Sequence, residues 1–287
     1  MVVPPLTDPN AREAFARDGY YVFTGLAAPI LREIADTYDD MLRELTPADP
    51  YFHCPMTGTN FIGNRDLRAR IVARVSELVA PRLAPLVDGH RVVGAGFRVK
   101  QTGNESYLPL HQDPSMVDED CQWSMNFIIP IIDTSDENGA LRVVPGSHRI
   151  MPKYRSLDLN DRAETLGVLE HIGESVRTIP MRAGDVILYF NSLLHGSGPN
   201  HTDRHRPVVL GTLMSRDTPM LLYLTSAESP KLLECYEVPD DYFNQMGDFL
   251  AEFKLRPKVG RRVDDVTDTY ELSREQIIAA IRAHGAQ

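Results

Sequence analysis

Between residues 91 and 216 the chain alternates short runs of β-branched and aromatic residues with turn-forming clusters, and this feature constrains the fold most. The clusters are TGNE, DENG, RAGD and SGPN, and helical patterns lie mainly before and after this region. A doubly wound α/β fold would need helices between successive strands, so the pattern favours a mainly β sandwich or double-sheet barrel. The runs predicted to be strands are GFRVKQ, SYLPLHQD, QWSMNFIIPIID, ALRVVPGS, SVRTIPM, DVILYF and RPVVLGTLMS.

Helical patterns flank these strands. NAREAFARDG and LREIADTYDDMLREL are predicted helices, with the short strand YYVFTGL between them. A further helix is predicted to begin near Asp66 and to be ended or broken by Pro81 and Pro85. SREQIIAAIRAHG predicts a final amphipathic helix. We expect a single domain, with a helical cap over about 9–90, a barrel core over about 91–216 and a C-terminal extension over 217–287.

The charge balance limits the partners of the chain. Lys and Arg number 30 against 40 Asp and Glu, and the formal net charge of −10 repels nucleic acid and anionic lipid. No apolar run approaches the roughly 20 residues that span a bilayer, and the N-terminus lacks the pattern of a secretory signal. The 3 cysteines form no CxxC pair. We expect a cytoplasmic monomer or homodimer that acts on a small molecule, with no nucleic-acid or membrane partner.

Two histidines and one aspartate have the spacing of metal ligands. His111 and Asp113 lie in LPLHQD at the end of a predicted strand, where residues i and i+2 point to the same face. His195, which follows the DVILYF run, is the best candidate for a third ligand. Such a set suits non-haem iron and leaves coordination positions open, whereas zinc ordinarily takes four ligands in a tighter site.

Arg206 stands eleven positions after His195. If the two flanking strands pair as an antiparallel hairpin closed by GSGPNHTDRH, Arg206 lies beside the metal, where a guanidinium binds a carboxylate through two parallel hydrogen bonds. Ser197 adds a hydroxyl for the same carboxylate. Arg204 competes for this role, but the spacing from His195 favours Arg206. A 2-oxo acid that chelates the metal and pairs its second carboxylate with Arg206 fits this arrangement, which describes 2-oxoglutarate.

Several other polar residues admit two interpretations. Arg98 and Lys100 share one strand face, so they either favour an anionic substrate or cosubstrate or form a solvated ion-pair face. Asn126 either binds the cosubstrate or the substrate, or is a core amide with satisfied hydrogen bonds. His148 in PGSHR is expected to be structural, and HTDRHR is expected to be the solvated tip of a hairpin.

From about Phe15 to about Ser215 the sequence resembles the phytanoyl-CoA dioxygenase family. The resemblance rests on HQD, DENGALRVVPGSHR, AGD before a strand, and HGSGPN with an arginine eleven residues beyond its histidine. FARDGYYVFTGL is also similar to the N-terminal region of that family. The resemblance implies a double-stranded β-helix, or jelly-roll barrel, and an oxygenase that depends on iron(II), 2-oxoglutarate and dioxygen.

The resemblance also implies roles for individual residues. Arg206 and Ser197 would bind the distal carboxylate of 2-oxoglutarate, and Lys100 occupies a position where members often keep a lysine near the cosubstrate. Ile128 stands where relatives often have tryptophan, so the pocket wall is altered. The implied iron ligands are His111, Asp113 and His195.

The implied reaction hydroxylates, or otherwise oxidises, an aliphatic C–H bond of a small molecule, and we expect an amino acid derivative or a natural-product intermediate. Halogenation is disfavoured, because a halogenase of this architecture needs a small residue in place of Asp113. An acyl-CoA hydroxylase is one alternative, although the chain shows no basic patch for the nucleotide. A hydrolase or isomerase that uses zinc or manganese, and a jelly-roll that binds metal without 2-oxoglutarate turnover, are the others. Candidate lids are DPSMVDEDCQ, Tyr51–Arg65 and the C-terminal extension.

Overall fold

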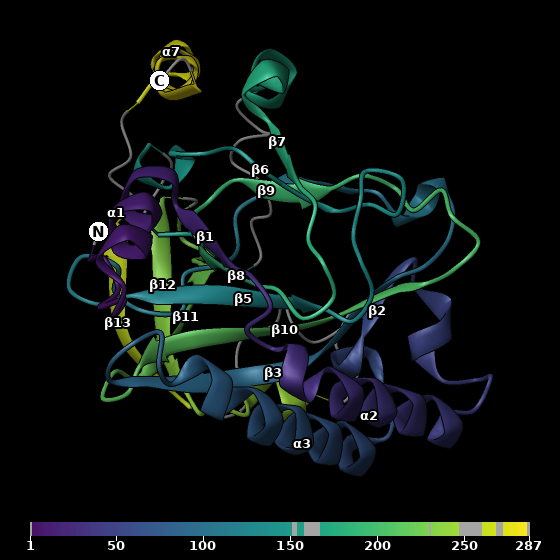
Figure 1. Cartoon of the computed structure of the whole chain (residues 1–287). Coiled ribbons are helices and arrows are strands. Elements are labelled where there is room, and N and C mark those ends of the chain that lie inside the picture. The colour runs from purple at the N-terminus through teal and green to yellow at the C-terminus, as the bar shows by residue number, and fades with distance from the viewer. Residues whose placement is uncertain are drawn as a thin grey trace.

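The computed structural model describes residues 2–150, 154–157, 167–229, 231–246, 260–267 and 272–285. Two antiparallel sheets stacked face to face form its centre (Figure 1). The larger sheet has the order β1(Tyr20–Phe23), β8(Val186–Phe190), β5(Ser124–Pro130), β10(Arg206–Ser215), β3(His90–Lys100) and β2(Met56–Gly58). The smaller sheet has the order β4(Leu108–His111), β9(His195–Ser197), β6(Leu141–Val143) and β7(Arg177–Ile179).

The predicted jelly-roll architecture is confirmed, as a sandwich and not as a closed barrel. Among the described strands, no ladder joins the smaller sheet to the larger one. β1 and β2 come from the first 90 residues and form the two edges of the larger sheet. The segment expected to be a helical cap therefore also contributes to the sheet that underlies the site.

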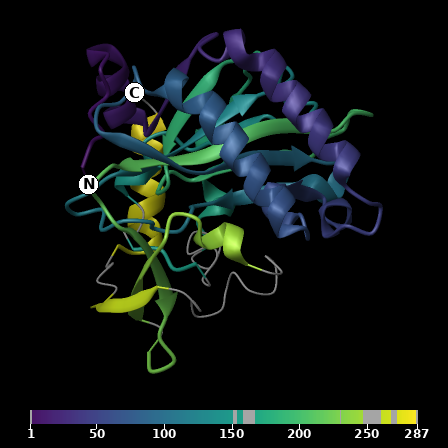
Figure 2. The same ribbon diagram turned by 90° about the horizontal axis from the view of Figure 1, so that it is seen from below.

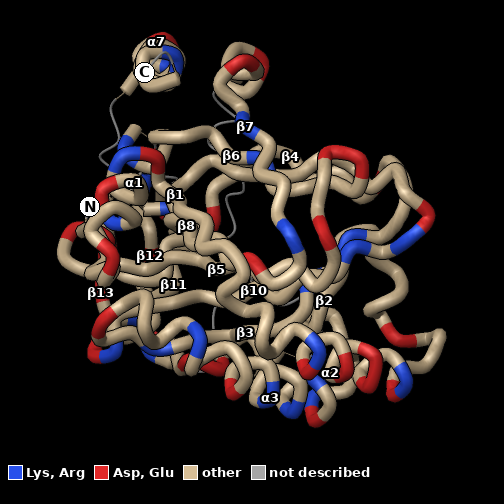
Figure 3. The backbone as a smooth tube through the Cα atoms, viewed as in Figure 1, with Lys and Arg blue, Asp and Glu red and all other residues tan. Residues whose placement is uncertain are grey.

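Two long helices cover the outer face of the larger sheet (Figures 1 and 2). They are α2(Leu31–Glu44) and α3(Arg65–Leu83), and their buried apolar side chains join the same core cluster as β3, β5 and β8. The cause is the amphipathic pattern of each helix, because an apolar stripe must be covered by another element. Both helices carry charged residues of both signs (Figure 3).

α3 continues through Pro81 and ends at Leu83, two residues beyond the first proline that was expected to end it. Pro81 lies in the last turn, so a kink at its ring displaces only the two helical residues that follow it. The helix then closes with a bond from the Ala84 N–H to the Ala80 carbonyl, before Pro85. A proline near the end of a helix therefore interrupts less than one in its middle.

The remaining elements frame the sandwich. α1(Pro9–Asp18) precedes β1, and its end is marked by Gly19, which has a φ of 87°. A third sheet consists of β11(Met220–Thr225), β12(Leu232–Val238) and β13(Arg261–Thr267), with the short α5(Tyr242–Gln245) after β12. The predicted final helix is α7(Arg274–Gly285), which buries Ile277 and Ile281. The 3-10 helices are Ala28–Ile30, Pro50–His53, Thr59–Phe61, Asn104–Ser106, Ser147–Arg149, Leu169–His171 and Gly173–Ser175.

Within the described ranges, none of the helices combines the length and the apolar character needed to cross a membrane. Part of the C-terminal extension, residues 247–259, lies outside the described residues. The described part of that extension packs in two places. Met220, Leu222 and Tyr242 share a core cluster with Met116, while α7 packs against Val144 and Leu194 of the smaller sheet and its loops.

Candidate metal and cosubstrate site

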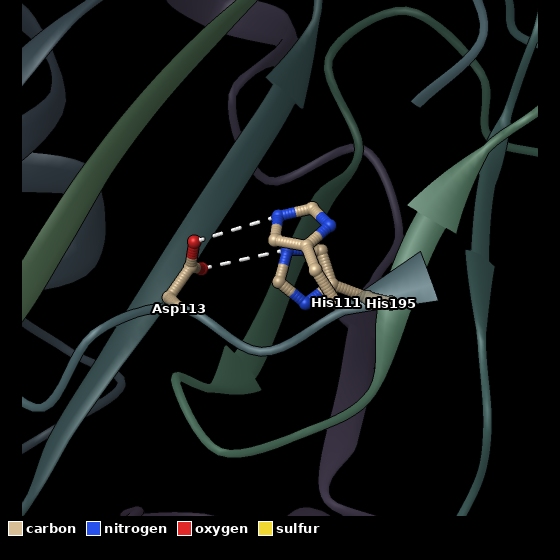
Figure 4. A group of neighbouring side chains, drawn as sticks. All are labelled: His111, Asp113 and His195. Atoms are coloured by element: carbon tan, nitrogen blue, oxygen red, sulfur yellow. Dashed lines mark ion pairs between the residues drawn. The ribbon is translucent and has the colours of Figure 1, made fainter. Parts of the chain in front are cut away.

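Three side chains with metal-binding atoms meet at one end of the smaller sheet (Figure 4). β4 pairs with β9 so that His111 lies opposite His195, and the centroids of the two imidazole rings are 4.4 Å apart. Asp113 follows His111 by two residues and faces both rings. The strand pairing therefore brings together residues that are far apart in the sequence.

The geometry of this triad suits a single divalent ion. The His195 Nε2 atom lies 3.4 Å from Asp113 Oδ2, and the His111 Nε2 atom lies 3.8 Å from Asp113 Oδ1. One ligand atom from each residue falls within 4.8 Å of the others. Ligands at about 2.0–2.2 Å from a common ion are separated by comparable distances. Because the set includes one carboxylate and two imidazoles, it suits iron and other transition metals better than calcium or magnesium.

Backbone carbonyls orient both imidazoles. The Nδ1 atom of His111 lies 2.9 Å from the carbonyl oxygen of Pro109, and that of His195 lies 2.9 Å from the carbonyl oxygen of Leu193. A carbonyl only accepts, so each Nδ1 carries the proton and each Nε2 presents a lone pair to the triad. Burial lowers the pKa of His195 to about 4, which keeps this ring neutral, as metal binding requires.

The larger sheet holds the carboxylate. Asn126 Nδ2 donates to Asp113 Oδ2 at 2.5 Å, and Asn126 Oδ1 accepts from Thr212 Oγ1 at 2.7 Å. The backbone N–H of Asp113 donates to the Asn191 carbonyl at 2.9 Å. Both ends of the Asn126 amide therefore have hydrogen-bond partners, and one of them is the triad residue Asp113. The sequence had left open whether Asn126 contacts cosubstrate or substrate or is a core amide with satisfied hydrogen bonds.

A buried ion pair braces the loop that carries the aspartate. Arg155 forms a two-pronged pair with Glu119, with Nη2 to Oε1 at 2.5 Å and Nη1 to Oε2 at 3.1 Å. Its Nε also donates to the backbone carbonyl of Asp113 at 2.7 Å. This pair could not be found from the sequence, because the two residues lie 36 positions apart in segments with no helical or strand pattern.

Arg206 and Ser197 line a cavity of about 430 Å³ together with the triad, and we refer to this space as the Arg206 cavity. The Arg206 side chain is buried, and its Nε has no hydrogen-bond partner among the described residues. Burial lowers the pKa of Arg206 to about 10. Arg204, the competing residue, is exposed. A buried guanidinium that faces a cavity needs an anionic ligand, and it is suited to a carboxylate.

The predicted hairpin between the strands of His195 and Arg206 is wrong. Arg206 was expected to approach the metal through a hairpin with the strand before it. Instead, β9 belongs to the smaller sheet and β10 to the larger one, where β10 pairs with β3 and β5. The connection crosses from one sheet to the other, so Arg206 reaches the cavity from the opposite layer. His201, Asp203, Arg204 and His205 of HTDRHR are exposed, whereas its last residue, Arg206, is buried and begins β10. The segment is part of this crossover and not the tip of a hairpin.

Lys100 lies opposite Arg206 in the pairing of β3 with β10. Its ammonium donates to the Ser106 carbonyl, and its carbon chain packs beside Gly139. Burial, followed by the charges of Arg206 and Arg142, lowers the pKa of Lys100 to about 7. Among the described residues that line the cavities at the triad, Lys100 does not appear. Lys100 therefore lies next to Arg206 on the neighbouring strand and does not line the cavities at the triad.

The other residues singled out in the sequence lie in different places. Ile128 lines the Arg206 cavity, so the expected alteration lies in the wall of that space. His148 is buried and stacks on the Phe190 ring at 5.0 Å, which is consistent with a structural role. Thr212, which donates to Asn126, was not among the candidates from the sequence. Its even spacing from Arg206 on one strand indicated that the two side chains lie on the same face.

Comparison with known proteins identifies the family. The family model described as phytanoyl-CoA dioxygenase (PhyH) matches residues 15–208. The chain belongs to the phytanoyl-CoA dioxygenase family. Dioxygenase FrzG of Cladobotryum sp is 27% identical over 234 residues, which cover 70% of this chain and 72% of FrzG. Dioxygenase FUM3 of Gibberella moniliformis is 32% identical over 91 residues, but these cover 31% of this chain and only 25% of FUM3.

Solved structures share the fold of this PhyH family chain. The epimerase SnoN, in complex with Fe3+, alpha ketoglutarate and nogalamycin RO, matches with a TM-score of 0.52 at 20% identity, covering 74% of this chain and 84% of SnoN. HygX from Streptomyces hygroscopicus, with nickel, 2-oxoglutarate and hygromycin B bound, matches with a TM-score of 0.51 at 18% identity, covering 73% of this chain and 88% of HygX. The predicted family, fold and enzyme class, a dioxygenase, are thus confirmed.

Proposed function

We propose that this PhyH family member is an iron(II)- and 2-oxoglutarate-dependent oxygenase that oxidises an aliphatic C–H bond of a small molecule. One observation carries the proposal. Two imidazole Nε2 atoms, one carboxylate and one buried guanidinium converge on a single cavity. The ligands named for the structural relatives SnoN and HygX, a metal ion and 2-oxoglutarate, support the same interpretation.

The residues fit both groups. His111, Asp113 and His195 would hold iron(II), because a two-histidine, one-carboxylate set leaves coordination positions open for a cosubstrate and dioxygen. The Arg206 Nε, which has no hydrogen-bond partner in the described part of the chain, fits the distal carboxylate of 2-oxoglutarate, and the Ser197 hydroxyl lines the same cavity. When bound, iron(II) and 2-oxoglutarate supply the oxidising chemistry, in which dioxygen is consumed and succinate and carbon dioxide are released.

The protein itself contributes placement. The carbonyls of Pro109 and Leu193 keep both rings in the tautomer that presents Nε2. Asn126 holds the carboxylate in a fixed orientation, and Arg206 fixes the far end of the cosubstrate. The cavity walls then decide which C–H bond of the substrate faces the metal, and this choice sets the product.

The finer assignment concerns the product and the substrate. Asp113 retains the carboxylate that a halogenase of this architecture lacks, so we propose hydroxylation or a related oxidation such as desaturation, epoxidation or ring closure. We propose a free amino acid derivative or natural-product intermediate as substrate. An acyl-CoA substrate is disfavoured because the chain is acidic, with a formal net charge of −10, and a nucleotide carries several phosphates.

An anaerobic titration of the metal-free protein tests the proposal. Addition of iron(II) and then 2-oxoglutarate should produce the visible metal-to-ligand charge-transfer band of the chelate. H111A and D113A should lose the band, and R206A should require at least about tenfold more 2-oxoglutarate, since it lacks a charge-assisted pair. R204A changes an exposed arginine and should behave as the wild type. A folded, metal-binding wild type without the band would contradict the proposal.

A further inference from the structure

A second cavity of about 520 Å³ adjoins the triad, and we refer to it as the Asn191 cavity. Arg206 and Ser197 line the Arg206 cavity but not this one, whereas Asn191 lines this one and not the Arg206 cavity. The two spaces meet along a shared wall. The residues that line both are Arg98, Leu108, His111, Asp113, Asn126 and Leu210. A cosubstrate in the Arg206 cavity therefore leaves the Asn191 cavity for the substrate.

The part of the Asn191 cavity outside the shared wall is uncharged. Its described lining residues include no aspartate, glutamate, lysine, arginine or histidine. The large apolar ones are Met116, Leu157, Leu222 and Phe243. The polar ones are Asn60, Gln112, Asn191 and Thr212. A wall that combines apolar side chains with a few neutral polar groups binds an uncharged body and orients it through hydrogen bonds.

Three of these polar side chains already have hydrogen-bond partners within the protein. Asn60 Oδ1 accepts from an arginine at 2.6 Å, and Gln112 Nε2 donates to the Ser192 carbonyl at 2.5 Å. Thr212 Oγ1 donates to Asn126 Oδ1 at 2.7 Å. Contacts within the protein therefore already orient these three side chains.

Asn191 differs from these three residues. It is only 1% exposed, and its Oδ1 has no hydrogen-bond partner in the described part of the chain. A buried polar atom without a partner destabilises a folded protein, so such atoms are rare and call for an explanation. Because Asn191 borders a cavity, a ligand that donates a hydrogen bond supplies the missing partner.

The backbone of Asn191 holds the residue beside the triad. Asn191 directly follows β8, and its carbonyl accepts from the Asp113 N–H at 2.9 Å. Asn191 therefore supports the triad aspartate through its main chain. The side-chain amide is not needed for that support, and its role has to be sought in the cavity that the residue lines.

We propose that Asn191 binds the substrate, and that the substrate is an uncharged molecule that donates a hydrogen bond to Asn191 Oδ1 from a hydroxyl or an amide N–H. This inference rests on the proposed function, because it takes the Arg206 cavity to hold 2-oxoglutarate. A turn about the last side-chain bond exchanges the two ends of the amide, so Oδ1 can face the cavity. The bond fixes one end of the substrate, and the C–H bonds near that donor then face the metal.

The test compares pairs of compounds that match in size and differ in one hydrogen-bond donor. Saturated lactams are paired with lactones, in which an oxygen replaces the N–H, and cyclic alcohols are paired with ketones. Each compound has roughly eight to fourteen heavy atoms, a size that suits a cavity of this volume. Anaerobic protein loaded with iron(II) and 2-oxoglutarate is titrated with each compound, and the heat of binding gives Kd.

In at least one type of pair, we expect the donor to bind about three- to tenfold more tightly than its partner, as one neutral hydrogen bond allows. A site built around a substrate O–H or N–H discriminates against an analogue that lacks it. A preference for lactams assigns the donor to an amide, and a preference for alcohols assigns it to a hydroxyl.

Variants of Asn191 complete the design. N191L keeps the approximate size of the side chain without its amide, so it should bind both members of a pair equally. Its urea midpoint should equal or exceed that of the wild type, because an unpaired buried polar group is lost. Its cobalt(II) affinity should stay within about twofold of the wild type, since the backbone holds Asp113. N191A should also lose the preference, and N10L, at an exposed position in α1, should retain it.

Several results would overturn the inference. The wild type could bind no compound of the panel, or show no preference in either type of pair, while its charge-transfer band leaves the proposed function intact. A preference that persists in N191L and N191A would remove Asn191 from substrate binding. A lower urea midpoint or weaker cobalt(II) binding in N191L would make the amide a structural support. If the wild type forms no band, the proposed function fails and this inference fails with it.

Discussion

Asn126 Nδ2 donates to Asp113 Oδ2 at 2.5 Å, and this hydrogen bond links the two sheets at the triad. Asn126 lies on β5 of the larger sheet, while His111 and His195 lie on paired strands of the smaller one. The orientation of the carboxylate is therefore set by one sheet and that of the imidazoles by the other. Metal binding at this site therefore depends on the relative position of the two sheets.

Replacing the amide should weaken metal binding. In N126A, Asp113 loses its side-chain donor and can rotate away from the histidines. Loss of a supporting hydrogen bond at a metal site costs about 10–100-fold in affinity, and we expect a decrease in that range. Anaerobic titration with cobalt(II), followed by its visible absorption, measures it. N10A removes an exposed amide in α1 and should match the wild type; equal affinity for N126A would refute the role of Asn126.

Gly196 allows the two histidine strands to pair closely. A Cβ at this position would lie 2.7 Å from the backbone oxygens of both Leu108 and Pro109 on β4. Because backbone atoms cannot move aside easily, G196A should separate β9 from β4 and lower the unfolding free energy by about 1–3 kcal/mol. It should also weaken metal binding.

Urea denaturation and cobalt(II) titration measure both effects of G196A. Gly173 offers a matched control, because a Cβ there meets nothing within 4 Å. G173A should therefore leave stability and metal affinity close to the wild-type values. A G196A variant as stable as G173A, with wild-type affinity, would show that the close approach of the strands is not required.

The buried pair of Arg155 and Glu119 should behave as a unit. Their side chains are only 7% and 5% exposed, so removing one partner leaves the other charge in a poorly hydrated place. We expect E119M to lower the unfolding free energy by about 3–5 kcal/mol. The double variant R155M/E119M should lose much less than the two single variants together. Urea denaturation of all four proteins gives the coupling, and additive losses would contradict a mutual interaction.

The burial of His148 makes stability depend on pH. Burial lowers its pKa from the usual 6.5 to about 4, with Arg149 and His284 acting in the same direction and Asp18 in the opposite one. The unfolded chain therefore binds more protons than the folded one between these values. Stability should rise with pH across that window and fall as pH drops, by about 3 kcal/mol in total.

Denaturation between pH 4 and pH 7 measures this slope, within the window set by the His148 pKa of about 4. In H148Q the rise should be smaller, whatever its absolute stability, because glutamine does not titrate. H201Q replaces an exposed histidine, and its profile should follow that of the wild type. A profile for H148Q parallel to the wild type would mean that other groups cause the pH dependence.

Much of the sandwich was predictable, because its longer strands alternate or concentrate β-branched residues between turn clusters. β5, β8 and β10 follow directly from such runs. β9 was not predictable, since its three residues, His195, Gly196 and Ser197, include no β-branched residue and no Phe, Tyr or Trp. Its conformation comes from pairing with β4 and β6 on either side. Strand partners are likewise invisible in a local pattern, and this is why the expected hairpin before Arg206 was wrong.

The residues of the site were likewise predictable only in part. The i, i+2 spacing of His111 and Asp113 pointed to two members of the triad, although β4 ends at His111 and Asp113 lies in the loop after it. Arg206 lines the same cavity as the triad, but not through the hairpin that its distance from His195 suggested. Alternation also placed Lys100 on the face of Arg98, but it did not reveal that the Ser106 carbonyl would engage the ammonium. Contacts made by irregular loops, such as that of Arg155 with Glu119, leave no periodic signal in the sequence.

A crystal structure of the protein grown without oxygen, with iron(II) and 2-oxoglutarate, tests the central claim most directly. Anomalous scattering at the iron edge locates the metal directly. We predict one peak within bonding distance of His111 Nε2, His195 Nε2 and the Asp113 carboxylate, with the distal carboxylate of 2-oxoglutarate on Arg206. Iron at another position, or 2-oxoglutarate turned away from Arg206, would contradict it.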